Sequence, residues 1–132
     1  MPIKKIAGRQ ELVVTYLNIG FADPTTYGVA EPAIDLPGNA VIVGGDVVVT
    51  TAWNSATTAT LKLGDALDDD RYTASPIDLK TAGRTTLTLT GYTHKPEALK
   101  ALIAQTGTAA TAGAARIAVQ YYVIGRSAFT QG

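Results

Sequence analysis

The chain has 132 residues, and its eleven basic side chains balance eleven acidic ones, so the formal net charge is zero. A neutral chain is not expected to bind nucleic acid or an anionic membrane electrostatically, because both need a basic excess. The sequence has no cysteine and a single histidine, which excludes disulfide scaffolds, thiolate zinc sites, cysteine nucleophiles and multi-histidine metal sites within one chain. No apolar run approaches the ~20 residues of a membrane span.

Length and composition predict one all-β domain. Thirteen glycines and six prolines separate short runs in which apolar and polar residues alternate, a pattern typical of strands and turns. We place the domain at residues 9–126. Residues 1–8 are expected to form a flexible arm or an edge strand, and residues 127–132 a flexible tail.

The predicted strands are segments in which the alternation continues between turn residues. In chain order they cover residues 11–17, 33–36, 40–43, 46–53, 59–63, 77–79, 85–90 and 115–124. Loops are predicted at 20–31 and 64–76, which contain proline, glycine and aspartate. The alternation points Leu87 and Leu89 inward, and in the last strand it assigns four residues to the core: Ile117, Val119, Tyr121 and Val123.

Gly44 and Gly45 separate two apolar runs and allow two interpretations. A two-glycine connection permits a tight hairpin turn. Glycine inside a strand also often marks a bulge, and we favour one bulged strand here.

Residues 95–105 are similarly ambiguous. Pro96 at a first helical position and apolar residues at helical spacing favour a short helix. Leu99, Ala101 and Ile103 also alternate as a strand, and the all-β surroundings favour that choice. Eight or so short strands then predict two packed antiparallel sheets, a β-sandwich of jelly-roll-like form.

Four aspartates and an arginine form the densest charge cluster: Asp65, Asp68, Asp69, Asp70 and Arg71. Closely spaced carboxylates can bind Ca²⁺. Their spacing, however, does not match the calcium-loop pattern, which also needs a later bidentate glutamate. We therefore predict a solvated loop, with one aspartate capping a turn and another pairing with Arg71, and no metal site.

His94 lies between Thr93 and Lys95 in a predicted loop. A general base needs an orienting partner and a nucleophile, and the sequence identifies neither. We expect an exposed loop histidine without a catalytic role.

Three aromatic residues are candidates for an interface: Trp53, Tyr121 and Tyr122. Together with Tyr16 they could also form a platform for sugars or bases. Core or interface positions are the more ordinary use of such residues in a sandwich. Tyr121 and Tyr122 are adjacent in a strand, so one of them must point out of the sheet.

Motifs for chemistry are absent from the sequence. It contains no phosphate-binding loop, no nucleophile elbow and no zinc-protease motif. We therefore expect a protein that is not an enzyme and that needs no cofactor.

Several segments taken together resemble small structural proteins of tailed bacteriophages, particularly capsid cement or decoration proteins. The resemblance covers roughly residues 36–122. It is carried by Leu-Pro-Gly-Asn at 36–39, Gly-Asp-Val-Val-Val-Thr-Thr-Ala-Trp-Asn-Ser at 45–55, Thr-Leu-Lys-Leu-Gly-Asp at 60–65 with Asp-Arg-Tyr at 70–72, and Thr-Ala-Gly-Ala-Ala-Arg-Ile-Ala-Val-Gln-Tyr at 111–121. Such proteins are often β-sandwiches or jelly rolls, which also favours a strand at 95–105.

The resemblance implies a non-enzymatic protein on the outer surface of a phage capsid. Its expected partners are the major capsid protein and further copies of itself, as a dimer or trimer. The alternative is a tail or head-fibre module that binds a host-surface glycan or another virion protein, because similar segments occur in such modules.

Overall fold

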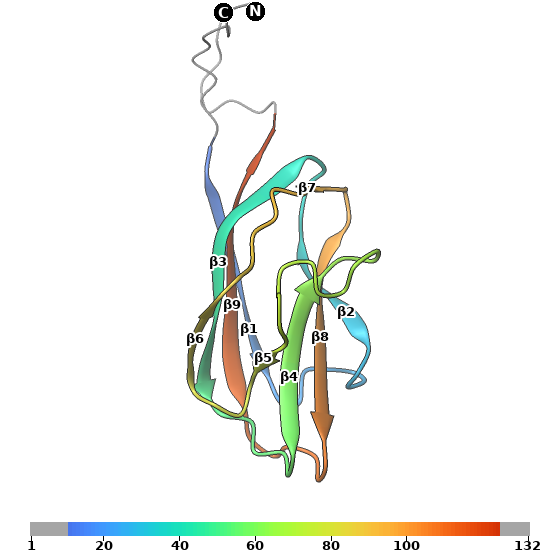
Figure 1. Cartoon of the computed structure of the whole chain (residues 1–132), viewed down its shortest axis with the longest axis vertical. Coiled ribbons are helices and arrows are strands. Elements are labelled where there is room, and N and C mark those ends of the chain that lie inside the picture. The colour runs from blue at the N-terminus through green and yellow to red at the C-terminus, as the bar shows by residue number, and fades with distance from the viewer. Residues whose placement is uncertain (1–10, 125–132) are drawn as a thin grey trace, which may run out of the picture.

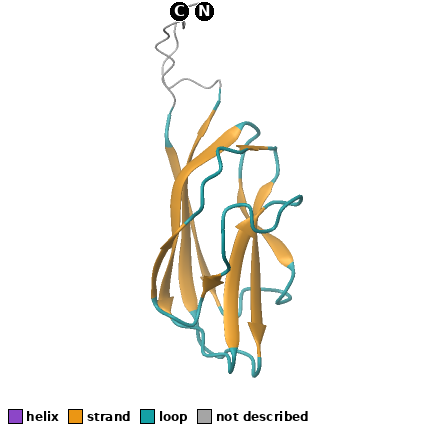
Figure 2. Cartoon of the chain, viewed as in Figure 1, coloured by secondary structure: helices purple, strands orange, loops and turns teal. Residues whose placement is uncertain are grey.

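The computed structural model describes residues 11–124. Within them the chain consists of strands and loops, with no helix (Figure 2), which confirms the predicted all-β class. The strands are β1 (Val13–Gly20), β2 (Ala30–Asp35), β3 (Ala40–Thr51), β4 (Thr58–Gly64), β5 (Ile77–Asp78), β6 (Gly83–Thr86), β7 (Thr93–His94), β8 (Ala98–Thr106) and β9 (Ala114–Val123).

The strands form two antiparallel sheets that face each other (Figure 1). The five-stranded sheet has the order β1-β9-β3-β6, with β7 also paired to β3, and the four-stranded sheet has the order β2-β8-β4-β5. With β7 set aside, the first strand pairs with the last, the second with the next to last, and so on inward to β4 and β5. A long hairpin wrapped into two sheets in this way is a jelly roll, as predicted.

The core lies between the sheets and follows the predicted alternation. In β4, Leu61 and Leu63 are fully buried while Lys62 between them is not. In β9, Ile117 and Val119 are fully buried. Two of the four residues assigned to the core in that strand, Tyr121 and Val123, are only half-buried. The reason is that β9 continues past the end of the facing sheet (Figure 1).

Two ambiguous segments are resolved as predicted. Residues 40–51 form one strand, β3, whose register with β9 shifts between Ile42 and Gly44. A side chain at Gly44 or Gly45 would collide with β9, because an added Cβ would lie 2.5 Å from the Gln120 side chain or 2.6 Å from a backbone oxygen. The stretch 95–105 contains β8, a central strand of its sheet, so the helical alternative is wrong.

The strand predicted at 85–90 is wrong in its position. β6 ends at Thr86, Leu87 is buried, and Leu89 is 45% exposed. The Leu87 N–H still donates to the Gly45 carbonyl at 3.1 Å, but the Thr88 N–H donates to the backbone carbonyl of Tyr72 at 2.8 Å. The chain therefore leaves β3 to bind a neighbouring loop.

Other boundaries also differ from the expectation. β1 extends to Gly20, beyond the predicted end at 17, and β2 begins at Ala30, inside the predicted loop 20–31. The expected arm at 1–8 and tail at 127–132 lie outside the described residues, so they and the domain limits stay predictions.

Candidate interaction surface

Trp53 follows β3 and belongs to the core of this chain. Its side chain is 1% exposed, and its Nε1 donates to the Tyr27 hydroxyl at 3.2 Å. An added Cβ at Gly113 would lie 2.5 Å from the indole ring, so the ring packs directly on backbone there. A buried ring cannot contact another protein, and Trp53 is therefore removed from the candidate interface residues.

Tyr121 and Tyr122 lie on opposite faces of β9. Tyr121 packs against the core, as the alternation with the buried Val119 requires. Tyr122 points to the other face of the sheet, and both rings are half-buried. The prediction that one of the two points outward is confirmed, whereas their role in an interface stays a prediction.

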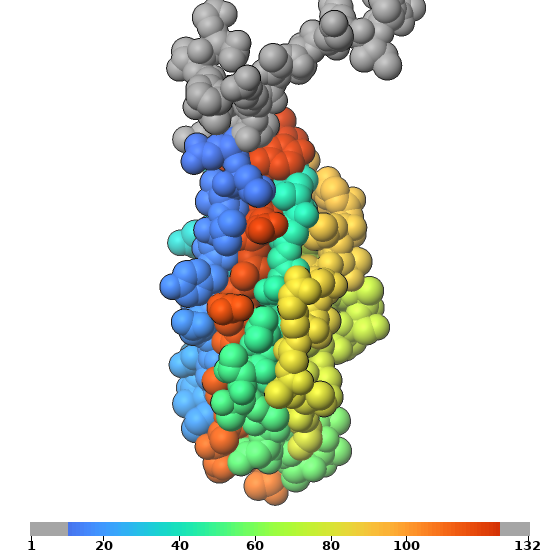
Figure 3. Space-filling model, turned by 90° about the vertical axis from the view of Figure 1, so that its left-hand side faces the viewer, coloured from blue at the N-terminus to red at the C-terminus, as the bar shows by residue number. Residues whose placement is uncertain are grey.

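The outward side chains of β1, β9 and β3 form one surface, which we call the exposed face (Figure 3). Its members are Val14, Tyr16, Asn18, Asp46, Val48, Arg116, Ala118, Gln120 and Tyr122. Val14 is 59% exposed and Tyr16 is 64% exposed. Asp46 on this face pairs with Arg84 of β6 at 2.6 Å. The exposed face is thus largely apolar beside β1 and charged toward β6.

His94 is not the exposed loop residue that the sequence predicts. It is 1% exposed because β7 pairs with the start of β3. Its Nε2 lies 3.0 Å from the Glu97 carbonyl, which can only accept, so Nε2 carries the proton. Nδ1 then accepts from the Tyr72 hydroxyl at 3.3 Å. Burial raises the pKa of Tyr72 to about 12, so this hydroxyl keeps its proton at neutral pH.

Asp65 organises the loop that follows β4. Its carboxylate accepts from the N–H groups of Leu67 and Asp68 at 3.0 and 2.9 Å, and Arg71 Nε donates to it at 2.6 Å. Burial by itself would raise the pKa of Asp65, but these hydrogen bonds and the charge of Arg71 outweigh it and lower the pKa. The sequence predicts one aspartate that caps a turn and another that pairs with Arg71, but in the structure Asp65 does both. Asp65 is also buried rather than solvated.

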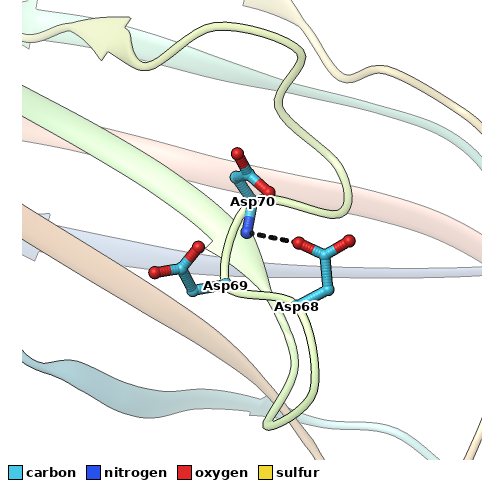
Figure 4. Close-up of side chains that lie close together, drawn as sticks. All are labelled: Asp68, Asp69 and Asp70. Carbon is cyan, nitrogen blue, oxygen red and sulfur yellow. Dashed lines mark hydrogen bonds between the residues drawn. The ribbon is translucent and has the colours of Figure 1, made fainter.

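The remaining aspartates of the loop form a cluster beside the end of β4 (Figure 4). Carboxylate oxygens of Asp68, Asp69 and Asp70 all lie within 4.8 Å of one another. The Asp70 N–H donates to the Asp68 side chain at 3.3 Å. The pKa of Asp70 is raised, chiefly by a hydrogen bond with the Asp68 side chain. Crowded surface carboxylates of this kind are ordinary, and the absence of a required metal stays a prediction.

Three of the solved structures that match this chain are phage capsids. A chain of the cyanophage Pam1 capsid is 24% identical, with a TM-score of 0.65, and the match covers 93% of this chain and 91% of that one. This chain has the fold of phage capsid chains. The capsid of Helicobacter pylori bacteriophage KHP30 gives 15% identity and a TM-score of 0.62, covering 85% and 87%, and that of Ralstonia phage GP4 gives 21% and 0.57, covering 96% and 91%.

The resemblance of the sequence to phage structural proteins is thus confirmed at the level of fold. No protein-family model matches the sequence, and no curated protein matches it. Residues 11–124 contain no helix that could cross a bilayer.

Proposed function

We propose that this chain is a non-enzymatic structural protein of a phage virion, which binds the outer face of the head and stabilises the shell. The observation that carries the proposal is the shared jelly roll, which matches chains of three phage capsids over at least 85% of this chain. The buried polar side chains also support it. Asp65, Tyr72 and His94 are occupied in holding loops together.

The proposed partners are the major capsid protein and further copies of this chain. A chain with no net charge should bind through a largely uncharged contact surface, and Val14, Tyr16 and Tyr122 supply such a surface on the exposed face. Tyr121, which is half-buried at the edge of the core, is also proposed as a contact residue. Each contact can be weak, because many copies bridging adjacent capsomers act together.

The test compares phage particles made with and without this protein. We expect particles without it to release their DNA at a lower temperature and after a milder osmotic shock. Electron microscopy should locate the protein as density over the shell. Equal resistance of both particles, with the protein located on the tail, would instead favour a fibre module that binds a glycan or another virion protein.

A further inference from the structure

β1 is an edge strand with one open side. Among the described residues it pairs only with β9. Its eight residues, Val13–Gly20, include no charged side chain and no proline. An open edge of this kind can pair with another strand, and natural proteins usually protect it with charges, proline, a bulge or short length.

The other sheet edges of the described chain carry such protection. β2 contains Pro32 and two acidic residues, and its register shifts beside that proline. β5 and β7 have only two residues each. β6 has four and carries Arg84. β1 is therefore the exception, both in its length and in its neutral composition.

The hydrogen-bonding geometry shows which groups of β1 are open. The Phe21 N–H donates to the Gly113 carbonyl of the β9 side at 3.1 Å. Since bonding direction alternates along a strand, the odd-numbered residues of β1 bond to β9 and the even-numbered residues face away. Gly20 is closed by Asp23, whose carboxylate accepts from the Gly20 N–H at 2.7 Å and whose N–H donates to Gly20 at 3.1 Å. Within residues 11–124, the outward backbone groups of Val14, Tyr16 and Asn18 have no partner.

The same three residues direct their side chains to the exposed face. Val14 and Tyr16 are more than half exposed, so apolar surface lies next to the open backbone groups. Figure 3 shows β1 along one margin of this face, with β9 and β3 beside it. A strand added to the margin would cover both the backbone groups and part of the apolar surface.

We propose that β1 pairs antiparallel with β1 of a second copy about a two-fold axis at Tyr16. In this register Tyr16 lies opposite Tyr16 of the second copy, and Val14 lies opposite Asn18. Every open N–H and C=O of the three residues then finds a partner, and the two five-stranded sheets become one continuous sheet. An antiparallel strand is its own complement about a two-fold axis. The neutral strand in a neutral chain adds no charge repulsion.

This inference goes beyond the proposed function, because it concerns the isolated chain and holds whichever particle the chain joins. Its test is the oligomeric state of the full chain by analytical ultracentrifugation, where we expect a dimer. Tyr16→Pro removes an N–H that only the second copy uses, so the chain should fold normally while the dimer dissociation constant rises at least about tenfold. Tyr16→Thr keeps the N–H and is the matched control, with a smaller rise.

A second variant tests the same contact if Tyr16→Pro fails to fold. Tyr16→Lys leaves the backbone intact and places two like charges opposite each other across the axis, so it should also dissociate the dimer. A wild-type chain that sediments as a monomer or a trimer would overturn the proposal. So would a folded Tyr16→Pro variant that remains dimeric.

Single cysteines test the register, because the natural chain has none. Under mild oxidation Tyr16→Cys should cross-link with itself. Val14→Cys and Asn18→Cys should cross-link only when the two variants are mixed. Self-cross-linking of Val14→Cys contradicts the register. A monomeric chain whose Tyr16→Pro variant no longer binds shells would mean that the capsid protein supplies the added strand, and the proposal would be wrong.

Discussion

Asp65 links a single side chain to the stability of a whole loop. It binds two backbone N–H groups and Arg71, whose guanidinium lies 3.6 Å above the Tyr92 ring. Through Arg71, Asp65 therefore connects the loop after β4 with the segment before β7. An added Cβ at Gly64 would meet the Asp68 carbonyl at 2.0 Å, so the loop also packs tightly on the end of the strand.

We expect Asp65→Asn to lower the free energy of unfolding by about 2 kcal/mol at pH 7, because it removes charge-assisted hydrogen bonds. The folded-state pKa of Asp65 is lowered from 3.8, so its contribution is complete above that pH and is lost as the pH falls further. The difference between variant and wild type should therefore shrink in acid. Urea unfolding at several pH values measures it, with the exposed Asp69→Asn as control. An equal effect of both substitutions would contradict the role of Asp65.

The exposed aspartate cluster gives a second expectation at this scale. Millimolar Ca²⁺ should leave the melting temperature unchanged, because Asp69 and Asp70 are exposed and Asp70 lies beside other carboxylates without a buried ligand set. A rise of several degrees that a chelator reverses would show a metal site through linkage.

His94 and Trp53 show which residue properties the sequence does not reveal. Neither the flanking threonine and lysine of His94 nor its position in a polar stretch indicates burial. Its burial depends on the pairing of Thr93–His94 with Ala40–Val41, more than fifty residues away along the chain. Trp53 is buried because Gly113 leaves room for its ring, which is likewise a non-local effect.

At the scale of elements, alternation predicts the strands that pair along most of their length. β4, β8 and β9 each have neighbours on both sides, so their two faces differ consistently in burial. The stretch 85–90 alternates equally well, yet its second half binds a loop instead of a strand. Competition between two backbone partners leaves no periodic signal in a sequence.

Val119→Asp tests the register of β9. The fully buried Val119 offers no partner for a charge, and an unpaired carboxylate there should cost several kcal/mol, a large share of the 5–15 kcal/mol that holds an ordinary domain together. We expect insoluble or non-cooperatively folded protein. Gln120→Asp, on the exposed neighbouring position, should fold and melt like the wild type in circular dichroism. Two equally stable variants would mean that the register is wrong.

At the scale of the whole molecule, composition predicted the class and the strand count predicted the two sheets. The open edge of β1 could not be predicted, since a strand becomes an edge only through the order of its neighbours in the sheet. A neutral run rich in β-branched and aromatic residues, such as Val13–Gly20, is equally typical of a strand buried in the centre of a sheet.

The strand order also has a consequence for synthesis. β9 is the last described strand along the chain, yet it lies between β1 and β3 and joins them. On the ribosome, β1 and β3 emerge early and must wait until residues 114–123 have been made before their sheet can close. The pairs that complete the fold are those farthest apart in the chain, so folding should be slow and largely post-translational. During that interval the side of β1 that will later pair with β9 is also unpaired, so both of its sides are exposed. A nascent chain at this stage is the form most in need of a chaperone.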